Sequence, residues 1–281
     1  MHLKLPITRE DAESHRLEDG NPVQTKPLAM PLAACLFLLQ FCLSPAAFAA
    51  RVDVVVDHGV EKNAENQARA IISGVFDFFH RTYGVAMQRD IRIKLSCDKF
   101  NYKKAIKDWY GASEAQASFL SHSMGLAKGG TLIVDLGDIK GNYLQLFILC
   151  HEIVHFYQGQ ESNDRHGPVR WMSEGVANVI AAHIMETAGG QSPGAWKKYW
   201  LERVKSVPNF PRLENLHSPE RMLVPLAYDT ASLAVLTLLE WRGYPALFAY
   251  FRNLKNTGAE NAFYQAFGAK LSDFEKSFRP Y

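Results

Sequence analysis

The sequence lacks the usual signs of a nucleic-acid-binding surface, because it has no block of basic residues and no stripe of alternating basic and aromatic residues. A strong excess of one charge is also missing. Residues 1–49 carry four of the 31 Lys and Arg and five of the 29 Asp and Glu, which leaves 27 against 24, a net charge of +3, for the other 232 residues. Internal repeats and low-complexity linkers are absent as well. These properties suit one folded unit with two lobes and no nucleic-acid partner.

The first fifty residues contain an apolar stretch, Leu28 to Phe48, that is too interrupted for a stable membrane span. The interruptions are Pro31, Gln40 and Pro45. Lys26 precedes the stretch, and Ala47-Phe48-Ala49 at its end is typical of a signal-peptide cleavage site. We therefore expect cleavage after Ala49 and export to the periplasm or secretion. An uncleaved signal that anchors the chain in a membrane is the alternative, and translation from Met30 instead of Met1 is also open.

Cysteine is scarce, with four residues in the whole chain. Cys35 and Cys42 lie in the expected signal peptide, so only Cys97 and Cys150 remain after cleavage. In an oxidising compartment these two can form a disulfide that would join the predicted sheet to the predicted metal-bearing helix. Two separate buried thiols are an equally good interpretation.

Proline and glycine are absent from Asn142 to Gln158, a largely apolar segment that predicts an uninterrupted buried helix. The segment contains the pattern His-Glu-x-x-His at His151 to His155. Histidines four residues apart project from the same face of a helix and can bind one metal ion together. Glu152 lies beside them. A pattern this short arises by chance in about one or two of a hundred such chains, so its context matters.

Three residues are candidates for a third ligand: Glu161, His166 and Glu174. Glu161 lacks the glycine spacing that a tight turn after the second histidine would require. His166 lies in a polar, turn-rich stretch, and we interpret it as a loop histidine, with substrate contact as the alternative. Glu174 begins an apolar segment that predicts a second helix, and Gly175 would let this helix approach the metal-bearing one closely. Three protein ligands and one position open to water are typical of catalytic zinc.

The pattern His151-Glu152-x-x-His155, followed after eighteen residues by Glu174 within Trp-Met-Ser-Glu-Gly-Val-Ala, resembles the gluzincin metallopeptidases. Within this group the sequence motif around Glu174 is most similar to that of the bacterial peptidase MA-like domains. The match is sharp over Asn142 to Ile184 and diffuse beyond. The resemblance implies that His151, His155 and Glu174 bind one zinc ion and that Glu152 is the general base.

Two further residues are candidates for supporting roles. Asn178 lies one turn after Glu174 and can accept a hydrogen bond from a metal-bound histidine, although gluzincins similar to thermolysin carry a carboxylate there. The alternative for Asn178 is a helix-surface residue. Tyr228 begins an apolar helix where the resemblance implies an oxyanion donor, and a core tyrosine is its alternative. Tyr157 and His166 are weaker substitutes for this donor.

Strands and helices alternate in the first part of the chain and only helices follow, which predicts an α+β fold. The resemblance implies a zincin-like fold: an N-terminal mixed sheet lobe with helices, a catalytic helix and a C-terminal helical lobe. The expected strands are 51–57, 91–96 and 131–136, and the expected helices between them are 61–83 and 102–110. The edge strand that would pair with substrate is either 122–127 or 131–136. His122, near this rim, is interpreted as a loop histidine, with substrate contact as the alternative.

The helices beyond Gly190 are predicted from residues that typically begin or end a helix. Ser192-Pro193 and Ser218-Pro219 each place a cap residue before a first-turn proline. The segment from Ala227 to Trp241 is apolar nearly all round and predicts a central buried helix that ends by Gly243. Ser272 and Glu275 are spaced as a capping box for the last helix. We expect an α/β lobe at 50–140, zinc-site helices at 141–190 and a helical lobe at 191–281, all in one peptidase domain after the leader and signal peptide, residues 1–49.

The sequence therefore predicts a zinc-dependent metallopeptidase that hydrolyses peptide bonds with a zinc-bound water and Glu152 as general base. Its expected partners are one Zn²⁺ per chain and a peptide or protein substrate. The alternative is a catalytically silent zincin-fold module, for binding or inhibition, whose metal site is structural or vestigial. The intact Glu152 favours catalysis.

Overall fold

The computed structural model describes residues 51–123, 125–137, 143–187 and 190–281 of the chain. The expected leader and signal peptide, with Cys35 and Cys42, lie outside these residues. Within the described ranges, none of the helices combines the length and the apolarity that crossing a membrane requires.

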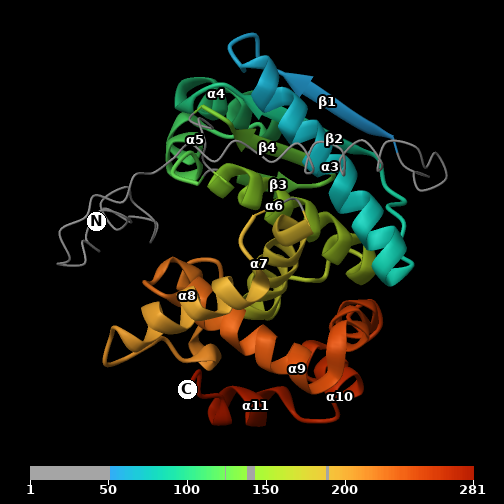
Figure 1. The fold of residues 1–281 in the computed structure, drawn as a ribbon, viewed down its shortest axis with the longest axis vertical. Helices are drawn as coiled ribbons and strands as arrows, with labels where there is room; N and C mark the ends of the chain where they lie inside the picture. The colour runs from blue at the N-terminus through green and yellow to red at the C-terminus, as the bar shows by residue number, and fades with distance from the viewer. Residues whose placement is uncertain (1–50, 124, 138–142, 188–189) are drawn as a thin grey trace.

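A four-stranded sheet forms one end of the molecule (Figure 1). The strands β1 (Val52–Val56), β2 (Ile91–Ser96) and β4 (Thr131–Asp135) are parallel neighbours, and β3 (Gly125–Lys128) pairs antiparallel with β4 at the edge. The sheet order is therefore β1-β2-β4-β3. Of the two edge strands considered from the sequence, the segment 131–136 is wrong because β4 is internal, whereas the segment 122–127 overlaps the edge strand β3 at 125–127.

Both faces of the sheet are covered, which explains why β4 is apolar at every central position. Leu132 and Val134 face the main core with α3 (Lys62–Tyr83), whereas Ile133 faces a second cluster with α4 (Lys99–Tyr110) and α5 (Glu114–Leu120). Side chains alternate between faces along a strand, so one strand supplies both clusters. The helix α5 was not expected from the sequence, although Ser113 and Gln116 form a capping box at its start.

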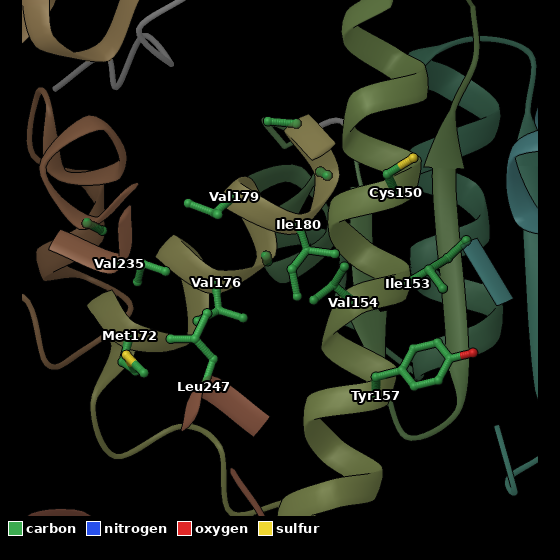
Figure 2. Packing of buried hydrophobic residues seen from close by; sticks show 14 of the residues in the cluster. Cys150, Ile153, Val154, Tyr157, Met172, Val176, Val179, Ile180, Val235 and Leu247 are labelled. Carbon is green, nitrogen blue, oxygen red and sulfur yellow. The ribbon is translucent and has the colours of Figure 1, made fainter. Parts of the chain in front are cut away.

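Two helices in the middle of the molecule join the sheet to the C-terminal part: α6 (Tyr143–Ser162) and α7 (Arg170–Thr187). Figure 2 shows Val154 of α6 and Ile180 of α7 between the two helices, and both side chains are fully or almost fully buried. This apolar contact fixes the separation of the helices. Since the metal-ligand candidates lie on both helices, it also fixes the distance between those ligands.

The C-terminal part is helical, with α8 (Pro193–Lys205), α9 (Ala227–Asn253), α10 (Ala259–Phe267), α11 (Leu271–Ser277) and two short 3-10 turns, 213–215 and 221–223. Gly243 has φ 74° and ψ 174° and breaks α9, so the prediction that a buried helix ends by this glycine is confirmed in its backbone angles. Ser192 caps α8 ahead of Pro193, as expected. The molecule is thus mixed α+β, as the sequence predicted.

Three local predictions are wrong, and one of the two alternatives for the cysteines is excluded. Gly175 does not serve the α6–α7 contact; an added Cβ would lie 2.5 Å from the Ala231 carbonyl oxygen, so this glycine allows α9 to approach. Ser272 does not cap α11, whose N-cap is Lys270 without a side-chain bond. Ser218-Pro219 precedes a short 3-10 turn instead of an α-helix. Cys97 and Cys150 are free thiols, which rules out the disulfide alternative in this structure.

Candidate metal centre

Three ligand atoms converge between α6 and α7. His151 Nε2 lies 3.0 Å from Glu174 Oε2 and 3.1 Å from His155 Nε2, and His155 Nε2 lies 3.5 Å from Glu174 Oε2. A tetrahedral zinc ion with bonds of about 2.0–2.1 Å separates its ligand atoms by about 3.4 Å. The three residues are buried, with at most 8% of the surface of each residue exposed. Among the described residues they form a group that can hold a metal ion.

The structure discriminates among the third-ligand candidates. Glu161 points to α9, where its carboxylate lies 3.6 Å from Arg252 Nη1, so it is not part of the cluster. His166 stacks on His155 with ring centroids 6.1 Å apart and lies outside the ligand group. Burial and the charges of His155 and Arg170 lower the pKa of His166 to about 4, which keeps this ring neutral beside the cluster. Of the three candidates, only Glu174 lies in the group that could hold a metal ion.

Asn178 supports His151, and a chain of hydrogen bonds shows which way its amide points. The Ser232 hydroxyl donates to the Tyr228 carbonyl oxygen at 2.7 Å, because a carbonyl can only accept. The Ser232 oxygen is then the acceptor for Asn178 Nδ2 at 3.0 Å, which leaves Asn178 Oδ1 facing His151 Nδ1 at 2.8 Å. Since Oδ1 can only accept, His151 carries its proton on Nδ1 and directs the Nε2 lone pair toward the cluster.

His155 is supported by a residue that the sequence did not single out. Its Nδ1 lies 2.8 Å from Gln158 Oε1, one turn later on α6. With both Nδ1 atoms engaged, two Nε2 lone pairs and one carboxylate oxygen face a common point. Three acceptors at this separation repel one another unless a metal ion or a shared proton lies between them, and two imidazole nitrogens with one carboxylate oxygen are a donor set that a divalent metal ion can use.

The two oxygens of the Glu174 carboxylate have different partners. Oε2 faces the histidines, while Oε1 is 2.6 Å from Arg170 Nη2, one turn earlier on α7. Burial raises the pKa of Glu174, but the charges and hydrogen bonds of His155, His151 and Arg170 outweigh burial and hold this pKa well below its ordinary value. For His155, burial lowers the pKa and Glu174 more than compensates, so the pKa is raised. Glu174 is therefore available as an anionic ligand.

Glu152 lies at the rim of the cluster beneath the edge strand. A Cβ added to Gly125 of β3 would be 2.8 Å from Glu152 Cγ and 2.8 Å from Ile148 Cγ2, so only glycine at this position lets β3 pass so close to α6. A glycine within a strand is the sequence signal for such an approach. Glu152 thus packs under β3, and it lines the same hollow as His151 and Gly125.

Tyr228, at the start of α9, has its ring centroid 6.5 Å from that of His151. The negative charge of Glu174 and burial raise the pKa of Tyr228 far above its ordinary value, so the phenol keeps its proton. Leu226, two residues earlier, has φ 64°, an uncommon backbone conformation for leucine that sets the direction in which α9 begins. The other candidates are elsewhere: Tyr157 stacks on Phe79 in the core, and exposed His122 bonds to the Phe119 carbonyl oxygen.

A largely apolar hollow of about 180 Å³ adjoins the cluster on the side of Glu152 and Tyr228. Its outer wall comes from α8 and includes Trp196, Tyr199 and Trp200, while Phe147 and Ile148 line it from α6. Arg203 and Asp229, which form an ion pair with 3.3 Å between Nε and Oδ1, also line it. The hollow, the metal cluster and the edge strand together form one candidate site.

No protein-family model matches this chain, and a comparison with curated proteins finds no significant match. The site therefore rests on its geometry. Its three buried ligand candidates could hold a metal ion, and Glu152 and Tyr228 line the largely apolar hollow next to them.

Proposed function

We propose that this protein is an exported zinc metallopeptidase of the gluzincin group with a zincin-like fold. The observation that carries the proposal is the triangle of His151 Nε2, His155 Nε2 and Glu174 Oε2, with sides of 3.0–3.5 Å and Glu152 beside it. The sequence order of these four residues and the resemblance around Glu174 support the peptidase assignment.

The residues divide the chemistry among them. A zinc ion held by His151, His155 and Glu174 would supply Lewis-acid chemistry, lowering the pKa of water toward about 7 and polarising a carbonyl. Glu152 takes a proton from the attacking water and delivers it to the leaving amine, since a carboxylate can accept and return a proton without moving far. Tyr228 donates its phenolic hydrogen to the developing oxyanion, a role that needs the neutral phenol that its raised pKa provides.

The surroundings of the cluster fit an extended peptide. β3 is paired with β4 on one side, so its other side offers backbone groups to which a substrate strand can add. Gly125 lies in this strand directly above Glu152, so a peptide bound there would have its backbone close to the general base. The apolar hollow next to Tyr228 would receive a large apolar side chain of the substrate.

The test begins with metal analysis of the purified full chain, followed by a peptide-library cleavage assay with and without a chelator. We expect about one zinc per chain and cleavage that is lost on chelation and restored by added zinc. Glu152→Gln should keep the metal, because it removes no ligand, while turnover falls by about 10²–10⁴-fold.

Glu161→Gln is the matched control, because this glutamate lies on the same helix and faces Arg252. Its turnover should remain near that of the wild type. Unchanged turnover in Glu152→Gln would overturn the proposed mechanism. Stoichiometric zinc with no cleavage of any peptide would instead support a catalytically silent zincin-fold module.

A further inference from the structure

Gln158 joins the two helices that carry the metal ligands. Its Oε1 lies 2.8 Å from His155 Nδ1, and it accepts a second hydrogen bond from the Ser173 hydroxyl at 2.6 Å. Its Nε2 donates to the Ser173 backbone carbonyl at 2.8 Å. Gln158 and Ser173 are 3% and 0% exposed, so water does not substitute for these bonds. All of the amide's strong contacts are therefore made with α7 and with one ligand histidine.

The contacts fix the orientation of the Gln158 amide. The Ser173 carbonyl oxygen has no hydrogen to donate, so the atom facing it is the amide nitrogen. The amide oxygen then faces His155 and can only accept, which requires a proton on His155 Nδ1. His155 is thereby kept in the tautomer whose Nε2 is free to bind a metal ion.

Ser173 precedes Glu174 directly, so the same amide also restrains the backbone that carries the third ligand. We propose that Gln158 and Ser173 form a positioning clamp that sets the His155 tautomer and fixes His155 on α6 relative to Glu174 on α7, and thereby determines the metal affinity. This inference rests on the proposed metal site. Gln158 is a positioning residue, because it reaches the metal site only through His155 and Ser173.

A neutral amide is needed at this position. A glutamate would place one of its two oxygens against the Ser173 carbonyl oxygen, and two acceptors in a buried space repel each other. The clamp on His155 therefore parallels the one on His151, where Asn178 accepts from the histidine and donates to Ser232. Both ligand histidines are supported by amides, and neither is paired with a second carboxylate through Nδ1.

The test compares two glutamines on the same helix. Gln158→Met keeps the volume of the side chain and removes the clamp. Gln160→Met is the matched control: Gln160 is also buried, but it binds the Gln88 N–H at 2.7 Å and the Ala86 carbonyl at 2.9 Å, away from the metal. Zn²⁺ and Co²⁺ affinities are measured for the full chain by competition with a chelator, and the Co²⁺ absorption spectrum is recorded.

We expect Gln158→Met to weaken both affinities by about 10–100-fold and to shift the Co²⁺ bands, whereas Gln160→Met leaves both unchanged. Ser173→Ala, which removes only one of the three bonds, should have a smaller effect in the same direction. Thermal unfolding of each variant shows whether the chain still folds, and equal loss of stability in the two methionine variants makes the affinity comparison direct.

The outcomes separate this proposal from the proposed function. Equal metal affinities for Gln158→Met and Gln160→Met would overturn the clamp and leave the peptidase assignment standing. A wild type that binds zinc but cleaves no peptide would overturn the peptidase assignment, while weaker binding by Gln158→Met would still support the clamp. A wild type that binds neither ion would overturn both.

Discussion

At the scale of single residues, Tyr228 lies next to His151 and keeps its phenolic proton. Its ring faces His151, and its pKa is raised because Glu174 and burial both disfavour the phenolate. We predict that Tyr228→Phe lowers turnover by about 10²–10³-fold without weakening metal binding, because the change removes one oxyanion donor and no ligand. Steady-state kinetics and a metal titration of the same preparation test this directly.

Tyr157→Phe provides the comparison for this substitution. The Tyr157 hydroxyl is buried and has no hydrogen-bond partner among the described residues, and its ring stacks on Phe79 with centroids 3.7 Å apart. Removing an unsatisfied buried hydroxyl should leave turnover unchanged and leave stability equal or slightly higher. A similar loss of turnover in both phenylalanine variants would contradict the role of Tyr228.

The sequence predicts residues whose spacing alone brings them together. His151 and His155 share a helix face, and Asn178 follows Glu174 by one turn, so their common direction needs no knowledge of tertiary structure. Gln158 and Ser173 meet across two helices, 15 positions apart, and a helical period says nothing of that contact. A polar side chain in an apolar helix was the available signal for Gln158, since such a side chain needs a partner when buried.

At the scale of elements, the crossing of β3 over α6 depends on one glycine. We predict that Gly125→Ala lowers turnover by about 10²-fold, because the new methyl group would meet Glu152 and Ile148 at 2.8 Å and displace the proposed general base or the strand. Metal affinity should change little, since neither residue is a ligand. Kinetics with a metal titration distinguish the two effects.

Gly74→Ala is the control for the glycine substitution. A Cβ at Gly74 on α3 would meet no atom within 4 Å, so alanine should be accommodated and should stabilise this helix by about 0.5–1 kcal/mol. Turnover should not change. Wild-type turnover in Gly125→Ala would show that the close approach of strand and helix is not required.

The ranges of helices and strands were predicted well where the spacing of apolar residues was regular. The packing partner of a glycine was not. The strand Ile91–Ser96 and the long helices follow directly from their apolar patterns. Gly175 correctly indicated a close approach, but the predicted partner, the metal-bearing helix α6, was wrong, because the helix that approaches is α9. The edge strand could not be chosen from the sequence because strand order depends on which neighbours pair, and alternation is the same in either order.

At the scale of the whole molecule, Glu275 ties the last helix to the metal-bearing region. Its Oε1 accepts from Trp171 Nε1 at 2.8 Å and from His217 Nε2 at 2.6 Å, and Trp171 lies three residues before Glu174. The hydrogen bond to Glu275 outweighs burial and raises the pKa of His217 above its ordinary value of 6.5. The charged histidine therefore favours the folded state.

The sign of the pH effect follows from this raised pKa. Stabilisation by His217 is fully present below its unfolded pKa and is lost as the pH rises through its folded pKa. We predict that His217→Ala lowers the free energy of unfolding more at about pH 6 than at about pH 9. Denaturant unfolding at both values measures the difference. The exposed His58 is the control, and a pH-independent loss in His217→Ala would refute the coupling.

The candidate metal ligands lie close together along the sequence, and this has a consequence for the newly made chain. His151 and Glu174 are 23 positions apart, and Asn178 is 27 from His151, so the segment that binds the ion closes only a short loop. Gly125 and Tyr228 come from outside this segment, one from the sheet and one from α9. Contacts of short sequence separation close the smallest loops, so the three candidate ligands can meet before Tyr228 is placed beside them. In the proposed peptidase, the complete catalytic site would therefore form only after α9 has packed beside α6.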